Sequence, residues 1–304
     1  MSTSAHRTAT DGSPADRHST PVEGVEVLGS LSPSRAGDFM TCPLLYRFRS
    51  VDRLPEEPSA DAVRGTVIHK VLEDLFDLPA LDRTPERAAQ MLRPAWDALV
   101  EAEPEVATLF ESGQRDFATW FESCGTVLER YFHLEDPQRL EPAERELYVE
   151  TLLDSRLLLR GFVDRVDVAP DGRIRVVDYK SGRSPGVGFE AKALFQMKFY
   201  ALVIWRLRGV VPSMLQLVYL GNGEILRYEP DEADLLATER KVEAVWRAIN
   251  RAAETGDWRP NRSRLCDWCS FQSLCPEFGG TPPPLPGVDP AASGELDTDE
   301  GITG

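Results

Sequence analysis

The sequence predicts a mixed α/β fold with a central mixed sheet flanked by helices. Three observations lead to this class. Apolar residues recur at helical spacing in the first part of the chain, the period changes to strand-like alternation from residue 146, and helical and strand patterns then alternate to residue 255. The chain has 304 residues and 42% hydrophobic composition, which is enough for one large domain that folds without disulfides.

The first elements are predicted to be helices. A short helix begins after Ser32, its expected N-cap, has Pro33 at its first position and ends near Pro43. Longer helices are expected at 62–78, 85–101 and 115–132. In the first of these, apolar residues recur every three to four positions and leave His69 and Glu73 one turn apart at the border of the apolar face.

Strands and two further helices complete the pattern. Strand-like alternation covers 146–149, 156–168 and 173–180. A helix at 189–207, strands at 214–220 and 224–228, and a long helix at 232–255 follow. Between the second and third strands, Pro170, Asp171 and Gly172 suit a three-residue hairpin loop, in which a type I turn is closed by a left-handed glycine. This register places Asp164 directly opposite Asp178.

Two opposed carboxylates indicate a cation site. Like charges in directly opposed positions destabilise a sheet, and a hard divalent cation such as Mg²⁺ or Mn²⁺ would offset the repulsion. Lys180 lies on the same strand face as Asp178, where it could orient or deprotonate a water at the metal, an arrangement suited to phosphodiester hydrolysis. The alternative is an ion-paired, solvated sheet face. Val176 and Val177 argue against it, because they indicate a buried strand.

A cysteine cluster near the C-terminus indicates a second metal site. Cys266, Cys269 and Cys275 lie within ten residues of one another, which is typical of metal ligands and not of a disulfide framework. A tetrahedral site needs a fourth thiolate. Cys42, at a predicted helix end, is the expected one, because Cys124 lies inside an apolar helical pattern. The residues alone leave both zinc and a 4Fe-4S cluster open.

The hairpin with its Asp164, Asp178, Tyr179 and Lys180 resembles the PD-(D/E)XK nuclease superfamily, and the wider pattern resembles its RecB-like exonuclease branch. The resemblance implies a restriction-endonuclease-like core with an N-terminal helical part and a C-terminal cysteine segment. It also implies that the two aspartates and the Tyr179 carbonyl bind Mg²⁺ or Mn²⁺ with help from His69. Lys180 would activate the attacking water.

The same resemblance extends to both sides of this motif. Gln196 and Tyr200, one turn apart on the next predicted helix, match residues that contact the DNA backbone or support the active site in the RecB-like branch. The cysteine pattern resembles the iron-sulfur staple of AddB nuclease domains and of CRISPR-associated adaptation nucleases. It therefore favours a 4Fe-4S cluster over Zn²⁺, with four ligands: Cys42, Cys266, Cys269 and Cys275.

The expected function is that of a divalent-metal-dependent DNA nuclease, an exonuclease acting on single-stranded DNA or DNA ends in repair or recombination. A non-catalytic iron-sulfur module for DNA binding or assembly, partnering a helicase, is the first alternative. A zinc-stapled protein with an ion-paired sheet and no nucleic-acid role is the second. The sequence contains no Gly-x-x-x-x-Gly-Lys-Ser/Thr loop, so any unwinding would come from a separate helicase.

The two ends of the chain are predicted to be disordered tails, flanking a nuclease domain at 29–278. Residues 1–28 hold four acids and two arginines, and 279–304 belong to an acidic end with too few apolar groups to offset ordering entropy. The net charge of −16 is thus partly a property of the tails, and it does not exclude DNA as a partner.

The expected location is the cytoplasm. No apolar run approaches the roughly 20 residues that a membrane-spanning helix needs, and no signal-peptide pattern precedes the predicted domain. An odd number of cysteines, five, with three crowded together, also favours a reducing compartment.

Overall fold

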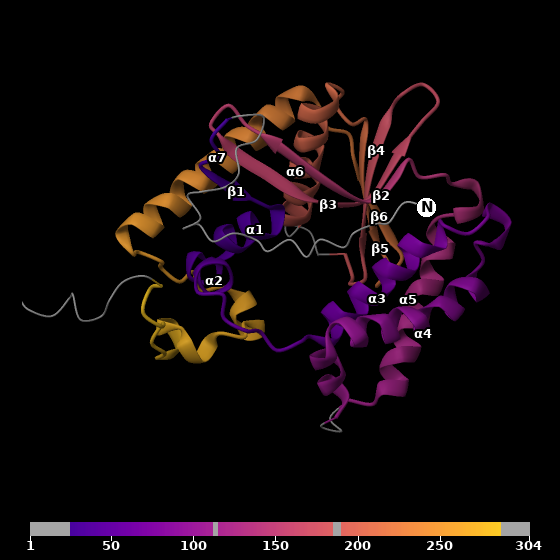
Figure 1. Ribbon diagram of the computed structural model, residues 1–304, viewed down its shortest axis with the longest axis horizontal. Helices are drawn as coiled ribbons and strands as arrows, with labels where there is room; N and C mark the ends of the chain where they lie inside the picture. Colours follow the sequence, from indigo (N-terminus) through magenta and orange to yellow (C-terminus); the bar gives the residue numbers. More distant parts are fainter. Residues whose placement is uncertain (1–24, 112–114, 185–189, 287–304) are drawn as a thin grey trace, which may run out of the picture. The chain divides into compact units, whose positions relative to one another are not determined.

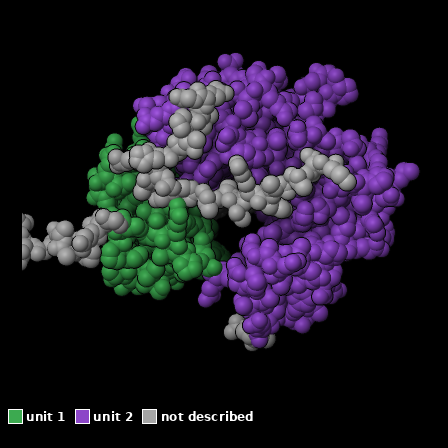
Figure 2. Space-filling view, viewed as in Figure 1, with its two compact units in different colours: residues 1–16, 38–56, 247–304 green, residues 17–37, 57–246 purple. Residues whose placement is uncertain are grey.

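The computed structural model describes residues 25–111, 115–184 and 190–286, so most of the predicted tails at 1–28 and 279–304 lies outside the described residues. The chain divides into two compact units, coloured separately in Figure 2. Among the described residues, unit 1 comprises those within 38–56 and 247–304, and unit 2 comprises those within 17–37 and 57–246.

Figure 1 shows a mixed sheet with helices around it. Its strands are β1 (Gly29–Leu31), β2 (Glu144–Leu152), β3 (Leu157–Val168), β4 (Ile174–Lys180), β5 (Met214–Tyr219) and β6 (Glu224–Tyr228). The α-helices are α1 (Pro33–Thr41), α2 (Pro43–Tyr46), α3 (Ala60–Leu75), α4 (Pro85–Ala102), α5 (Phe117–Leu134), α6 (Glu190–Arg208) and α7 (Glu232–Thr255). A π-helical turn η1 (Arg47–Val51) and 3-10 turns η2 (Ala80–Asp82), η3 (Pro104–Phe110), η4 (Pro137–Arg139), η5 (Arg264–Trp268), η6 (Gln272–Leu274) and η7 (Pro276–Phe278) complete the described elements. Each predicted helix and strand is observed, with ends that differ by a few residues.

The sheet of unit 2 has the strand order β1-β3-β4-β5-β6, with β2 along the other edge of β3. The β1–β3 and β4–β5 ladders are parallel and the other ladders are antiparallel. The β1 ladder ends at Leu159 and the β4 ladder begins at Arg165. These two neighbours of β3 therefore separate over residues 160–164.

Helices cover both faces of the central strands. Val177 and Tyr179 on β4 belong to the apolar core formed with α3, α4 and α5, which lie together in Figure 1. Asp178 and Lys180, the alternate residues of the same strand, contact Gln196 of α6. Because successive strand residues point to opposite faces, α6 covers the face opposite to α3.

The β3–β4 hairpin has the predicted geometry. The Gly172 amide donates to the Ala169 carbonyl at 2.8 Å, the Ala169 amide donates to the Arg173 carbonyl at 2.9 Å, and Gly172 adopts a φ of 83°. Arg165 pairs with Val177, which is the predicted register. The ladder stops there, so Asp164 and Asp178 lie one step beyond the last backbone pair.

A second hairpin, between β2 and β3, has the same form but no glycine. The Arg156 amide donates to the Leu153 carbonyl at 2.8 Å, and the Leu153 amide donates to the Leu157 carbonyl at 3.0 Å. Arg156 takes the left-handed position with a φ of 61°. An arginine in this position costs backbone energy that a glycine would not, and it removes the usual sequence signal of the turn.

Unit 1 joins two distant segments of the chain through aromatic side chains. The Tyr46 ring stacks on Trp258 with a centroid separation of 5.9 Å and an interplanar angle of 15°. Phe48 and Phe271 lie 5.2 Å apart. These contacts give unit 1 a small apolar core built from both segments.

In the part of the chain that the structure describes, the helices are too short or too polar to cross a membrane.

Candidate functional site

The candidate site lies where β3 and β4 separate. The Asp164 carboxylate accepts a hydrogen bond from the Tyr179 amide at 2.7 Å. This bond to a side chain replaces the backbone hydrogen bond that would continue the β3–β4 ladder. His69, on α3, places Nε2 2.9 Å from the Tyr179 carbonyl oxygen and Nδ1 3.5 Å from Asp164 Oδ2. The separation of the strands thus brings Asp164, Tyr179 and His69 together, and all three are residues that the sequence singled out.

Asp178 and Lys180 form the second half of the site. Lys180 Nζ lies 2.7 Å from Asp178 Oδ2, and Asp178 is only 2% exposed. Gln196 links the two, since its amide donates to Asp178 Oδ1 at 3.0 Å and its carbonyl accepts from Lys180 at 3.1 Å. The lysine is therefore held in one orientation by two partners.

One group of side chains could hold a metal ion within the described residues. It consists of His69, Glu146 and Asp164, each of which offers a ligand atom within 4.8 Å of the others. Asp178 is not a member of this group, and its carboxylate pairs with Lys180. The acidic oxygens suit a hard divalent cation, and the histidine adds a nitrogen ligand.

Glu146 is the candidate metal ligand that sequence analysis did not reveal. It lies on β2 between two ladder pairs, Arg145 with Arg165 and Leu147 with Val163, which places it opposite Asp164. Its φ of 43° is a left-handed conformation that a glutamate adopts only at a cost. Recognition of the glycine-free hairpin at 154–156 would have established this register.

The electrostatics of the group favour an added positive charge. Burial raises the pKa of Asp164 to about 7, and the charge of Asp178 acts in the same direction, while His69 and the Tyr179 amide oppose it. Burial also raises the pKa of Glu146. A divalent cation would stabilise both carboxylates in their ionised form.

Tyr200 packs against β3 next to the candidate site. The side chain is 7% exposed, and a Cβ at Gly161 would lie 2.8 Å from its ring, so the ring packs directly on the strand. Burial raises the pKa of its hydroxyl, and Gln196 is its hydrogen-bonding neighbour. Gln196 thus contacts Asp178 and Lys180, and Tyr200 lies against Gln196 and Gly161. A contact of either residue with the DNA backbone stays a prediction.

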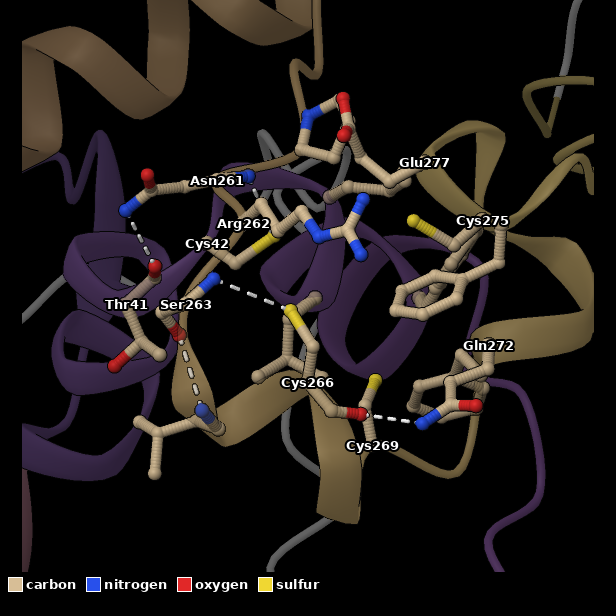
Figure 3. Close-up of a pocket in the computed structure, with 17 residues that line it drawn as sticks. Thr41, Cys42, Asn261, Arg262, Ser263, Cys266, Cys269, Gln272, Cys275 and Glu277 are labelled. Carbon is tan, nitrogen blue, oxygen red and sulfur yellow. Dashed lines mark hydrogen bonds between the residues drawn. The ribbon is translucent and has the colours of Figure 1, made fainter.

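Four cysteines line one pocket of unit 1. Figure 3 shows the side chains of Cys42, Cys266, Cys269 and Cys275 around the same space. Cys42 is the N-cap of α2, and the other three lie in or beside the short turns η5, η6 and η7. Cys124 lies elsewhere, fully buried on α5 in unit 2, where burial raises the pKa of its thiol to about 11.

Backbone amides point at two of these sulfurs. The Asn261 amide donates to Cys42 Sγ and the Ser263 amide donates to Cys266 Sγ, both at 3.4 Å. Burial raises the pKa of Cys275, and the charges of the other three cysteines add to this effect. Amide donors of this kind stabilise thiolates that bind a metal.

Acidic residues at the point where β3 and β4 separate, next to a lysine held in one orientation, are typical of a metal-dependent hydrolase. The chain belongs to the PD-(D/E)XK nuclease superfamily, whose family model matches residues 30–276. It is accordingly a nuclease, and members of this superfamily use divalent metals.

Two phage proteins and one solved structure are similar to this chain. The Gene 69 protein of Mycobacterium phage D29 is 28% identical over 271 residues, which cover 81% of this chain and 96% of that protein. The Gene 69 protein of Mycobacterium phage L5 is 24% identical over 287 residues, with the same coverage. A candidate exonuclease from Eubacterium rectale matches at a TM-score of 0.51 and 14% identity, covering 79% of this chain and 86% of that one. This last likeness shows a shared fold.

The raised pKa of Asp164 predicts how stability depends on pH. The folded state without metal binds a proton more tightly than the unfolded state does, because the pKa rises from 3.8 to about 7. Stability of the metal-free protein should therefore fall as pH rises through this interval, by a few kcal/mol, and then level off. Chemical denaturation in EDTA at several pH values measures this slope.

Asp164→Asn should flatten that slope, and saturating Mn²⁺ should flatten it in the parent. Asp171→Asn, in the exposed hairpin loop, is the matched control and should leave the slope as it is in the parent. Because the pKa of Glu146 is also raised, some slope should remain in Asp164→Asn. A slope equal to that of the parent would assign it to other groups.

Proposed function

We propose that this protein is a divalent-metal-dependent DNA exonuclease that acts on single-stranded DNA or DNA ends in repair or recombination. The observation that carries the proposal is the meeting of the His69, Glu146 and Asp164 group with the Asp178–Lys180 pair at the point where two strands part. Membership of the nuclease superfamily supports hydrolysis as the reaction.

Each residue has a distinct part in the proposed reaction. A bound Mg²⁺ or Mn²⁺ would supply Lewis acidity at the scissile phosphate. His69, Glu146 and Asp164 would hold it, together with the Tyr179 carbonyl and Asp178. Lys180 would orient the attacking water, take part in its deprotonation, and offset charge on the phosphate oxygens.

Gln196 is a positioning residue in this scheme. Its side-chain amide bonds to both the Lys180 ammonium and the Asp178 carboxylate and so fixes their positions relative to each other. Tyr200 lies next to Gln196. In the free protein Lys180 pairs directly with Asp178. With Asp178 serving as a ligand of a bound cation, the Lys180 ammonium would be available to orient the attacking water.

We also propose that the four cysteines bind a 4Fe-4S cluster. Tetrahedral zinc with bonds of about 2.3 Å would bring its sulfurs to within about 4 Å of one another. Within the described residues no three cysteine sulfurs lie within 4.8 Å, although all four cysteines line one pocket. In a cubane each thiolate binds a different iron, so a pocket lined by four separate cysteines can accommodate a 4Fe-4S cluster.

Replacement of one proposed cluster ligand should distinguish a cluster bound by four cysteines from four cysteines that bind no metal. Cys42→Ser in anaerobically purified protein is expected to lose the brown absorbance and most of the bound iron, with a lower melting temperature. The physical reason is that a missing ligand opens the site that joins the two segments of unit 1. Iron analysis, visible absorbance and thermal unfolding measure the change.

Cys124→Ser is the matched control, since Cys124 is a cysteine of unit 2 that lines no part of this pocket. It should keep the iron content of the parent. Parent protein that contains stoichiometric zinc and no iron would overturn the cluster assignment and favour the zinc-stapled alternative.

The test of the nuclease proposal is a direct assay. Protein purified with its iron is incubated with end-labelled single-stranded and double-stranded DNA in Mg²⁺, Mn²⁺ or EDTA. Mononucleotides or short products released only with metal, and faster from single strands, are expected. Binding without cleavage in either metal would favour the alternative of a non-catalytic module that partners a helicase.

A further inference from the structure

Two exposed aromatic side chains form a pair beside the candidate metal group. Tyr148 on β2 and Phe162 on β3 are 43% and 48% exposed. They are directly paired in the β2–β3 ladder, and their ring centroids lie 5.2 Å apart. Large aromatic side chains of this chain are mostly buried, so two exposed rings in contact form an unusual surface feature.

The pair lies two residues along each strand from the candidate metal ligands Glu146 and Asp164. Glu146 precedes Tyr148 by two residues on β2, and Asp164 follows Phe162 by two residues on β3. Two residues of a strand span about 6.6 Å. Phe162 also belongs to the stretch 160–164, over which β1 and β4 separate. The span of about 6.6 Å between the aromatic pair and the candidate metal ligands is close to the length of one extended nucleotide.

The neighbours of the pair keep it in place and supply charge. The Tyr148 hydroxyl donates to Glu150 at 2.7 Å. Glu150 in turn pairs with Arg160 in the ladder, so the acid lies next to an arginine. The opposite face of these strands is closed, because Val149 is 3% exposed and Gly161 meets the Tyr200 ring. Only the face with the two rings is therefore open to a ligand.

We propose that Tyr148 and Phe162 form a stacking platform for the bases of a single DNA strand whose phosphate enters the metal group. This inference rests on the proposed nuclease function and adds the feature that selects the substrate. Every base has a π-face, so such a platform tolerates any sequence. In duplex DNA the faces of the bases are covered by their neighbours, so only an unpaired strand or a frayed end can use it.

The experiment is a chemical double-mutant cycle. A single abasic residue is moved one position at a time along a labelled single-stranded oligonucleotide. Binding is measured by fluorescence anisotropy in EDTA, and cleavage is measured as kcat and KM in Mn²⁺. The proteins are the parent, Phe162→Leu, which keeps apolar bulk without a ring, and Phe162→Trp, which keeps a ring. Val168→Leu, on the same strand at an exposed position, is the matched control.

The parent should lose about five- to a hundredfold in affinity when the abasic residue occupies the position next to the scissile phosphate. Phe162→Leu should show a similar loss with the intact oligonucleotide and no further loss with the abasic one, with the effect in KM and not in kcat. Phe162→Trp and Val168→Leu should behave as the parent.

Two results would overturn the platform. One is an abasic profile of Phe162→Leu that matches the parent, which would leave the pair as a cross-strand contact that only stabilises the sheet. The other is the absence of single-strand binding by the parent. Parent protein that binds with the expected abasic profile but does not cleave would contradict the nuclease proposal and leave the platform intact.

Discussion

Lys180→Ala is expected to lower kcat for DNA cleavage by about 10²- to 10⁴-fold, the range typical of a lost general acid-base or orienting group. Its ammonium lies 2.7 Å from Asp178 and 3.1 Å from Gln196, so the variant removes the positive charge next to the Asp178 carboxylate. Binding of DNA should change little. Single-turnover cleavage in Mn²⁺ measures the chemical step.

The control for this variant is Lys198→Ala. Lys198 lies on the same helix as Gln196 but bonds to Asp234 at 2.8 Å and to Tyr228 at 2.9 Å, away from the metal group. It should keep kcat within a few-fold of the parent. Equal rates for Lys180→Ala and the parent would remove the lysine from the mechanism, and with it the proposed reaction.

Arg165→Met is expected to destabilise the protein by about 3–5 kcal/mol, the range for a buried ion pair that loses one partner. Arg165 is fully buried and donates to both oxygens of Glu135, at 2.8 and 2.9 Å, and to the Tyr179 hydroxyl. Burial opposes ionisation of Glu135, but Arg165 outweighs it and holds the pKa of that carboxyl below its usual value. Chemical denaturation gives the free energy of unfolding.

The double variant Arg165→Met with Glu135→Gln should recover part of this loss, because it no longer leaves a buried charge without its partner. Arg173→Ala is the surface control, since this arginine is 71% exposed in its pair with Asp171. It should change stability by less than about 1 kcal/mol. A similar small change for Arg165→Met would show that the buried network contributes little.

The sequence was sufficient for the parts of the site that lie on one hairpin with a glycine turn. Pro170, Asp171 and Gly172 determine the register of β3 and β4, and that register alone places Asp164 opposite Asp178. Helical periodicity was likewise sufficient to predict α3 and α6, and so to place His69 and Gln196 on helices.

The residues that escaped sequence analysis depend on features without a local signal. Glu146 and the Tyr148–Phe162 pair follow from the β2–β3 register, and Arg156 occupies the position where a glycine would have marked that turn. The burial of Arg165 was also unpredictable, because its partner Glu135 lies 30 residues away, directly after α5. Tertiary packing, and not propensity, decides such positions.

The construction of unit 1 has a consequence for how the protein is made. Asn261 donates to Cys42 across 219 residues of chain, and Arg47 bonds to the Pro283 carbonyl across 236. Residues 38–56 therefore leave the ribosome long before the segment they pack against exists. Translation must pass residue 283 before these contacts of unit 1 can form, whereas the sheet of unit 2, which ends at Tyr228, is already synthesised by then. Any cofactor insertion into the cysteine pocket thus follows synthesis of the sheet of unit 2.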